Sequence, residues 1–71
     1  MRSEILFRDE EGRQWKVMRT AVRLDCVAML KFVSDAGEQR SCEVIALDDD
    51  TWASLPERAC RSLVRAARPV D

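Results

Sequence analysis

Three cysteines, Cys26, Cys42 and Cys60, are the strongest nucleophiles in this chain, and no histidine accompanies them. Without histidine the chain lacks the Cys–His and Ser–His–Asp combinations that act near neutral pH, and it lacks a common zinc ligand. A thiol can also be activated by a cationic neighbour or a helix N-terminus. Because Cys60 falls inside a predicted helix and the other two fall in predicted strands, we interpret all three as small buried hydrophobes.

A run of carboxylates, Asp48, Asp49 and Asp50 with Glu57 nearby, is the one cluster that could hold a hard cation. The run lacks the glycine and the alternate-residue spacing of a calcium loop. Acidic residues are also favourable at the positive end of the helix dipole, and we adopt this second interpretation. Two glycines in total leave no phosphate loop and no dinucleotide fingerprint. The sequence therefore predicts no metal, no cofactor and no enzymatic activity.

Four arginines could bind an anionic partner. At ~100° per residue they fall within an arc of ~80° on one face of the predicted C-terminal helix. They are Arg58, Arg61, Arg65 and Arg68. Three interpretations stay open, namely a solvated helix face, a surface for an acidic protein and a surface for nucleic acid. The net charge of −1, from 12 basic and 13 acidic side chains, argues against nucleic acid.

Trp52 is expected in a loop beside charged residues. An indole in a loop is a common interface anchor, because it supplies a large contact area at little cost in entropy. The alternative is that Trp52 covers one end of the core. Trp52 and the four arginines are the candidate partner-binding residues.

Two hairpins must position these residues, each built from an extended run, a tight turn with Asp and Gly, and a second run. In the first hairpin Ile5 and Phe7 share one face, and Trp15 and Val17 share one face of the return strand. We expect Trp15 to anchor the core, since an indole buries more area than its neighbours.

In the second hairpin the residues from 26 to 33 are almost all apolar, which is typical of a central strand covered on both faces. The alternation in residues 39–47 predicts a fourth strand that is largely buried toward its end. The spacing of Ser54 and Glu57 matches a capping box with a proline between them, and Pro69 stops the helix.

The predicted helix is amphipathic, with its apolar positions on the side opposite the arginines. These positions are Leu55, Ala59, Leu63, Ala66 and Ala67. We expect this apolar face to lie on the sheet and to leave the guanidinium groups in water.

Length and composition indicate one small domain. A chain of 71 residues buries only about 60% of the surface of its unfolded form, and pairing with a second copy is a common remedy. The apolar runs are shorter than the roughly 20 residues of a membrane helix. The first residues lack an apolar export segment, so we expect a cytoplasmic protein.

The opening D-x-x-G-R-x-W-x-V pattern over residues 9–17, the segment 30–40, Trp52-x-x-Leu55 and the segment 67–70 resemble a group of uncharacterised short bacterial proteins. The resemblance covers most of the chain and implies the same architecture and a bacterial source. It implies no activity and no catalytic residue. The chain departs from the pattern in having three aspartates where those proteins tend to have prolines before the tryptophan.

The sequence thus predicts an α+β fold, a four-stranded antiparallel β-meander of two hairpins with one C-terminal amphipathic helix. The single domain spans residues 1–71, with strands at about 4–8, 13–19, 26–34 and 39–47 and a helix at about 55–68; residues 20–25 receive no prediction. The predicted function is a small non-enzymatic protein–protein interaction module, with a homodimer as one form of it. The alternative is nucleic-acid binding through the arginine face.

Overall fold

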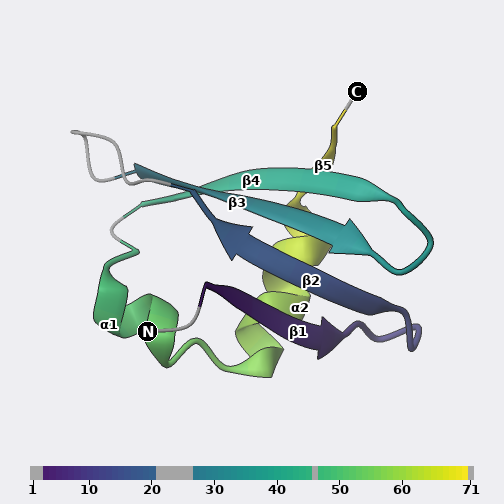
Figure 1. Ribbon diagram of the computed structural model, residues 1–71, viewed down its shortest axis with the longest axis horizontal. Helices are drawn as coiled ribbons and strands as arrows, with labels where there is room; N and C mark the ends of the chain where they lie inside the picture. The colour runs from purple at the N-terminus through teal and green to yellow at the C-terminus, as the bar shows by residue number, and fades with distance from the viewer. Residues whose placement is uncertain (1–2, 21–26, 46, 71) are drawn as a thin grey trace.

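The chain forms a five-stranded antiparallel sheet with a helix across one of its faces (Figure 1). The computed structural model describes residues 3–20, 27–45 and 47–70. In chain order the elements are β1 (Glu4–Arg8), β2 (Gln14–Arg19), β3 (Val27–Ser34), β4 (Gln39–Ile45), α1 (Asp49–Ala53), α2 (Glu57–Ala66) and β5 (Arg68–Pro69). The strands lie side by side in chain order. The predicted small α+β fold with an antiparallel sheet is confirmed, with one strand and one helix more than predicted.

Both hairpin turns depend on a glycine in the left-handed region, Gly12 at φ 84° and Gly37 at φ 90°. Only glycine adopts this conformation without steric cost. The first turn is fixed further by Asp9, whose Oδ1 accepts hydrogen bonds from the backbone N–H groups of Glu11 and Arg13, each 2.9 Å long. The predicted Asp/Gly turns are therefore where the sequence placed them.

The register of the strands collects the large apolar side chains on one face. Ile5 pairs with Val17 and Val17 with Phe32, so these three form one row across the sheet. Phe7 pairs with Trp15 in the next row. Trp15 is 1% exposed, which confirms it as a core residue.

The prediction that β3 is covered on both faces is wrong. Leu30 and Phe32 are fully buried, whereas Lys31 between them is exposed and Met29 and Val33 are half-buried. The reason is that α2 covers only one face of the sheet, and Figure 1 looks onto the other face with α2 behind it. The predicted start of this strand at Cys26 lies outside the described residues.

The end of β4 is also more exposed than predicted, because Ile45 is 78% exposed. Strand alternation places Ile45 on the face without a helix, opposite Val27 of β3. Leu47, beyond the strand, is 3% exposed and joins the core.

The predicted helix at 55–68 is divided differently in the structure. Asp48 is the N-cap of α1, and its carboxylate accepts a hydrogen bond of 2.7 Å from the backbone N–H of Thr51. The predicted cap Ser54 instead ends α1, and α2 starts after Pro56 without a side-chain cap. The acidic run therefore starts a helix, but a different helix from the one predicted.

The C-terminal end differs as well, since α2 stops at Ala66 and the next residues turn into β5. Arg68 pairs with Ser41 and Pro69 with Arg40, at the edge of the sheet. Proline suits an edge strand, because it has no N–H to offer a further neighbour.

The buried side of α2 is centred on Cys60 and Val64, which are 0% and 3% exposed. Leu55 and Leu63 pack partly against this core, as predicted, but Ala66 is exposed. At ~100° per residue the helix is rotated by roughly 110° from the predicted orientation. Ala66 has little apolar area, so its exposure costs little free energy.

Candidate functional site

The four candidate arginines do not form one solvent-exposed row in the structure. Arg58 and Arg65 are exposed on α2, Arg61 is half-buried, and Arg68 lies in β5. The rotation of α2 explains the difference, since it turns Arg61 toward β1. The predicted basic face is thus split between a helix and a strand.

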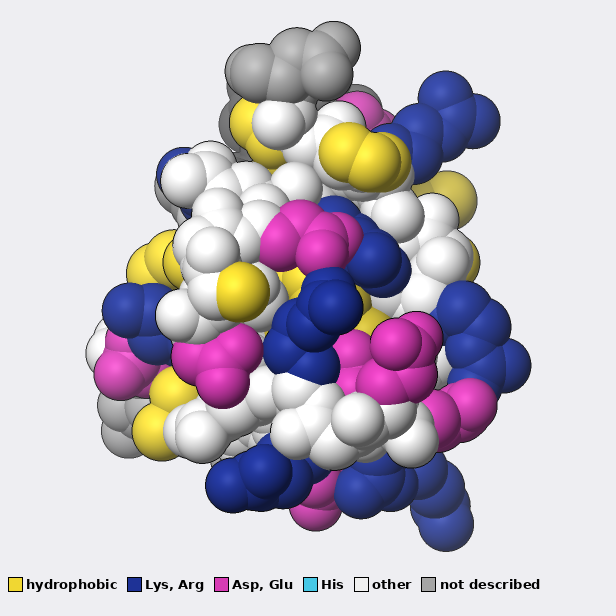
Figure 2. Space-filling view, turned by 90° about the vertical axis from the view of Figure 1, so that its right-hand side faces the viewer, with side chains coloured by type: hydrophobic (Ala, Val, Ile, Leu, Met, Phe, Trp, Pro, Cys, Tyr) yellow, Lys and Arg dark blue, Asp and Glu magenta, His cyan; other side chains and the backbone are white. Residues whose placement is uncertain are grey.

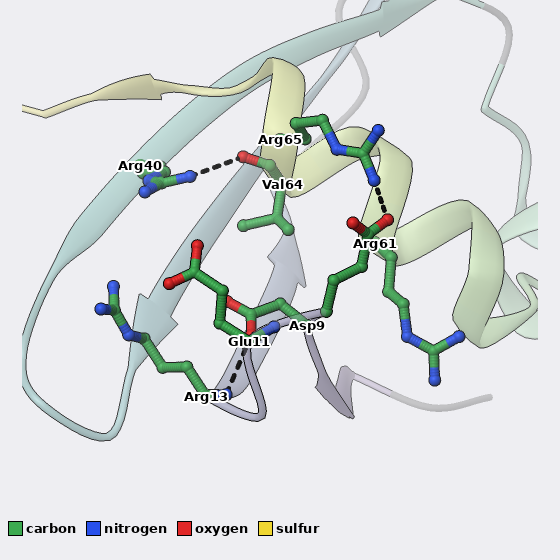
Figure 3. Close-up of a pocket in the computed structure, with 8 residues that line it drawn as sticks. Asp9, Glu11, Arg13, Arg40, Arg61, Val64 and Arg65 are labelled. Atoms are coloured by element: carbon green, nitrogen blue, oxygen red, sulfur yellow. Dashed lines mark hydrogen bonds and ion pairs between the residues drawn. The ribbon is translucent and has the colours of Figure 1, made fainter.

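Two of these arginines fasten α2 to the first hairpin. Arg61 donates a hydrogen bond of 2.9 Å from Nε to the backbone carbonyl oxygen of Arg8, and its Nη2 lies 3.0 Å from a carboxylate oxygen of Glu57. Arg65 forms an ion pair with Glu10 of the turn (Figure 3). Their charges are therefore already partnered within the protein.

A small hollow of about 120 Å³ lies between this turn and α2. Figure 3 shows its side chains approaching from the turn, from β4 and from the helix. The lining residues are Asp9, Glu10, Glu11, Arg13, Arg40, Arg61, Val64 and Arg65. Acidic and basic groups alternate around it. The hollow is therefore better suited to joining the turn to α2 than to binding an anion.

Three of these lining residues, Asp9, Arg13 and Arg40, contact the Trp15 indole. Glu38 binds Arg13 through one carboxylate oxygen and Arg40 through the other, both at 2.6 Å. The guanidinium carbons of Arg13 and Arg40 lie 6.0 Å and 5.1 Å from the centroid of the Trp15 ring, within the range of a cation–π contact. The Trp15 N–H donates a 2.8 Å hydrogen bond to Asp9.

Figure 2 looks onto the end of the molecule where the two hairpin turns lie. Lys and Arg side chains alternate there with Asp and Glu side chains, and no broad basic patch is visible on this view. This end of the molecule thus carries charges of both signs.

Trp52 lies in α1, so the prediction of a loop is wrong. Its side chain is 1% exposed and belongs to the core. Arg19 covers it, with the guanidinium carbon 5.8 Å from the ring centroid, and the same guanidinium binds Asp49 at 2.5 Å and the carbonyl oxygen of Leu47 at 3.3 Å. The burial supports the interpretation that Trp52 closes one end of the core, and leaves no indole surface for a partner.

The described thiols are poorly placed for nucleophilic chemistry. Cys60 is fully buried in α2. Cys42 is half-buried in β4, and burial raises the pKa of its thiol above the ordinary value, which keeps it protonated near neutral pH. Cys26 lies outside the described residues.

Two aspartates are held in the charged form by hydrogen bonds. The Trp15 indole, together with backbone N–H groups of the turn, lowers the pKa of Asp9. The backbone N–H of Thr51 lowers the pKa of Asp48. Both carboxylates stabilise a turn or a helix start, and their perturbed pKa values need no catalytic explanation.

The face of the sheet opposite α2, which we call the open face, is the surface that sequence reasoning missed. It carries exposed Leu6 and Ile45, at 61% and 78%, in a setting of half-buried apolar side chains. Strand alternation and register assign to it Leu6, Lys16, Met18, Met29, Lys31, Val33, Glu43 and Ile45. Apolar and charged side chains are mixed on this face.

A signal for the open face was present in the sequence. A single helix can cover only one face of a sheet, so the second apolar side of a strand rich in apolar residues has to remain accessible. The surplus of apolar side chains in the third and fourth strands indicates an interaction surface, but composition alone does not say which face of the sheet carries it.

No family model, curated protein or solved structure matches this chain. The resemblance to short bacterial proteins therefore stays a prediction. Among the described residues, none of the helices has the length and apolar character needed to cross a membrane.

Proposed function

We propose that this protein is a non-enzymatic protein–protein interaction module whose contact surface is the open face of the sheet. The observation that carries the proposal is the one-sided cover of the sheet. Burying Leu6 and Ile45 against a partner would remove apolar area from water, at about 25 cal/mol per Å². The chain itself places no described helix on that face, since α2 packs on the other one.

The candidate residues on the opposite side of the molecule hold the fold together. Arg61 and Arg65 join α2 to the first hairpin, and Trp52 is enclosed by the core. A partner that used these groups would have to break the ion pairs or open the core. A partner that binds the open face would break none of these ion pairs and would leave the core closed.

The experiment compares protein capture by wild type with capture by a variant of the open face, Leu6→Ser combined with Ile45→Ser. Both side chains are exposed, so the fold should survive, and circular dichroism verifies this. A matched control, Ala53→Ser combined with Arg58→Ser, changes two exposed residues on the helices. Proteins retained by wild type and by the control but lost from the open-face variant support the proposal. Equal capture by all three proteins, together with unchanged self-association of the open-face variant, would overturn it.

The alternative of nucleic-acid binding has less support, because the net charge is −1 and two of the four arginines are already paired. Gel shifts with random DNA and RNA at low ionic strength test it directly. A shift that weakens steeply with salt would favour it, and its absence would remove it.

A further inference from the structure

The partner of the open face can be inferred from its charges, and this step depends on the function proposed above. We infer that the open face binds the open face of a second copy of this chain, with Lys31 of each copy opposite Glu43 of the other and the two Met29 side chains at the centre.

The first observation is a pair of unused opposite charges. Lys31 and Glu43 are both exposed, and neither forms an ion pair with any other residue that the structure describes. The nearby charges Lys16 and Glu4, in contrast, form a pair with each other, at 3.8 Å. Lys31 and Glu43 are therefore a cation and an anion that no described residue neutralises. Arg68, which pairs with Ser41 at the edge of the sheet, adds a second exposed cation to this face.

The second observation is how the register arranges these charges. Lys31 pairs with Ser41 and Met29 pairs with Glu43, so Lys31 and Glu43 are diagonal neighbours on adjacent strands. With about 4.8 Å between strands and about 3.4 Å per residue, their Cα atoms lie roughly 8 Å apart. Met29 occupies a corner between them.

A two-fold axis in the plane of the interface, midway between the two charges, exchanges them. Each Lys31 then faces a Glu43, which is the self-complementary arrangement that a two-fold dimer requires. The same axis passes close to Met29 and brings Met18 of one copy near Ile45 of the other. The strands of the two sheets cross at roughly 70°, near the orthogonal class of sheet packing.

The surface also has the shape and size for such a contact. A hollow of about 380 Å³ reaches from Met29 to the β5 edge of the sheet and has room for a long side chain from the other copy. Its lining residues are Met29, Ser41, Cys42, Glu43, Ala66 and Arg68. The sheet lies in the plane of the two longest extents of the whole molecule, 33 Å and 27 Å, which set an upper limit on the size of the face (Figure 1). A standard interface buries about 800 Å² on each partner, so the contact would use most of the open face.

Self-association fits the thermodynamics of so short a chain. A domain of 71 residues leaves a large share of its apolar surface in water. A second copy is present wherever the first is, and a two-fold dimer uses the same face of both copies. Joining two such faces converts the one-sided core into a core shared by two sheets.

The test is a charge exchange followed by analytical ultracentrifugation over a range of concentrations. Lys31→Glu alone and Glu43→Lys alone should each weaken the dimer by roughly tenfold or more, because like charges then face each other. The double variant Lys31→Glu/Glu43→Lys should recover it. An equimolar mixture of the two single variants should form mixed dimers, since every contact again joins opposite charges. Arg58→Glu, on α2, repeats the charge change of Lys31→Glu and should leave the dimer unchanged.

Two results would overturn the inference. One is a monomer at all concentrations, and the other is a dimer that ignores the exchange of Lys31 and Glu43. The proposed function is judged separately, because a monomer that still loses captured proteins through Leu6→Ser/Ile45→Ser retains the module and replaces the second copy with another protein. If the protein is a monomer and the open-face variant captures the same proteins as wild type, both proposals fail.

Discussion

Arg40 donates a hydrogen bond from Nη1 to the backbone carbonyl oxygen of Val64, and the two atoms are 3.0 Å apart. Arg40 belongs to β4, and Val64 lies in the last turn of α2. Carbonyl groups at this end of a helix have no partner within the helix and carry the negative end of its dipole. A guanidinium from the sheet therefore both satisfies the carbonyl group and fixes where the helix ends.

Arg40→Met should lower the free energy of unfolding by about 1–2 kcal/mol, because it removes the bond to Val64 together with the ion pair to Glu38. Methionine keeps most of the apolar contact with Trp15. Urea denaturation measures the effect, with Arg58→Met as the control expected within about 0.5 kcal/mol of wild type. Equal loss in both variants would show that the contact to the helix end contributes nothing of its own.

Asp9 should make the protein sensitive to acid. Hydrogen bonds in the folded state hold the pKa of its carboxyl below the ordinary value of 3.8. The sign follows directly, since a lowered folded pKa gives stability that is fully present above pH 3.8 and is lost as the pH falls through the folded pKa. Asp9→Asn should therefore flatten the dependence of the urea midpoint on pH in that window. Asp35→Asn, which makes the same substitution in the other turn, is the matched control.

The two hairpins were predictable because their signals are local. Ile5 and Phe7 show the two-residue period of a half-buried strand, and a left-handed glycine such as Gly12 closes a turn by its own conformational freedom. The position of Trp15 in the core followed from the same alternation. None of these inferences needed to know which other element lies nearby.

The division of the C-terminal segment was not predictable in the same way. Two N-terminal signals compete there, one at Asp48 and one at Ser54, and the sequence does not rank them. The contacts of Arg19 with Asp49 and with Leu47 favour a helix at the first position. Such contacts join residues about thirty positions apart and leave no trace in a local pattern. The candidate site was missed for a related reason, since exposure of Ile45 depends on which face of the sheet the helix covers.

Trp52→Ala should lower the free energy of unfolding by about 3–5 kcal/mol, because it leaves a large cavity at one end of the core. For a domain of this size that loss is a large fraction of the total stability. Trp52→Phe keeps an aromatic ring and should remain folded, which allows a measured urea midpoint if the alanine variant does not fold. Leu6→Ala, on the open face, serves as the exposed control. A wild-type midpoint for Trp52→Ala would mean that the indole does not support the core.

The two described thiols should differ in reactivity in a way that reports directly on the packing of α2 against the sheet. Cys60 is fully buried, so a maleimide should label it only as fast as the protein unfolds. Cys42 is half-buried with a raised pKa, so its labelling should be slow at neutral pH and should accelerate as the pH rises and the thiolate forms. Peptide mapping by mass spectrometry separates the two sites, and the same reaction in urea supplies the unprotected rates. Native labelling of Cys60 at its rate in urea would contradict the observed position of α2, since that helix shields the thiol only while its Cys60 and Val64 side faces the sheet.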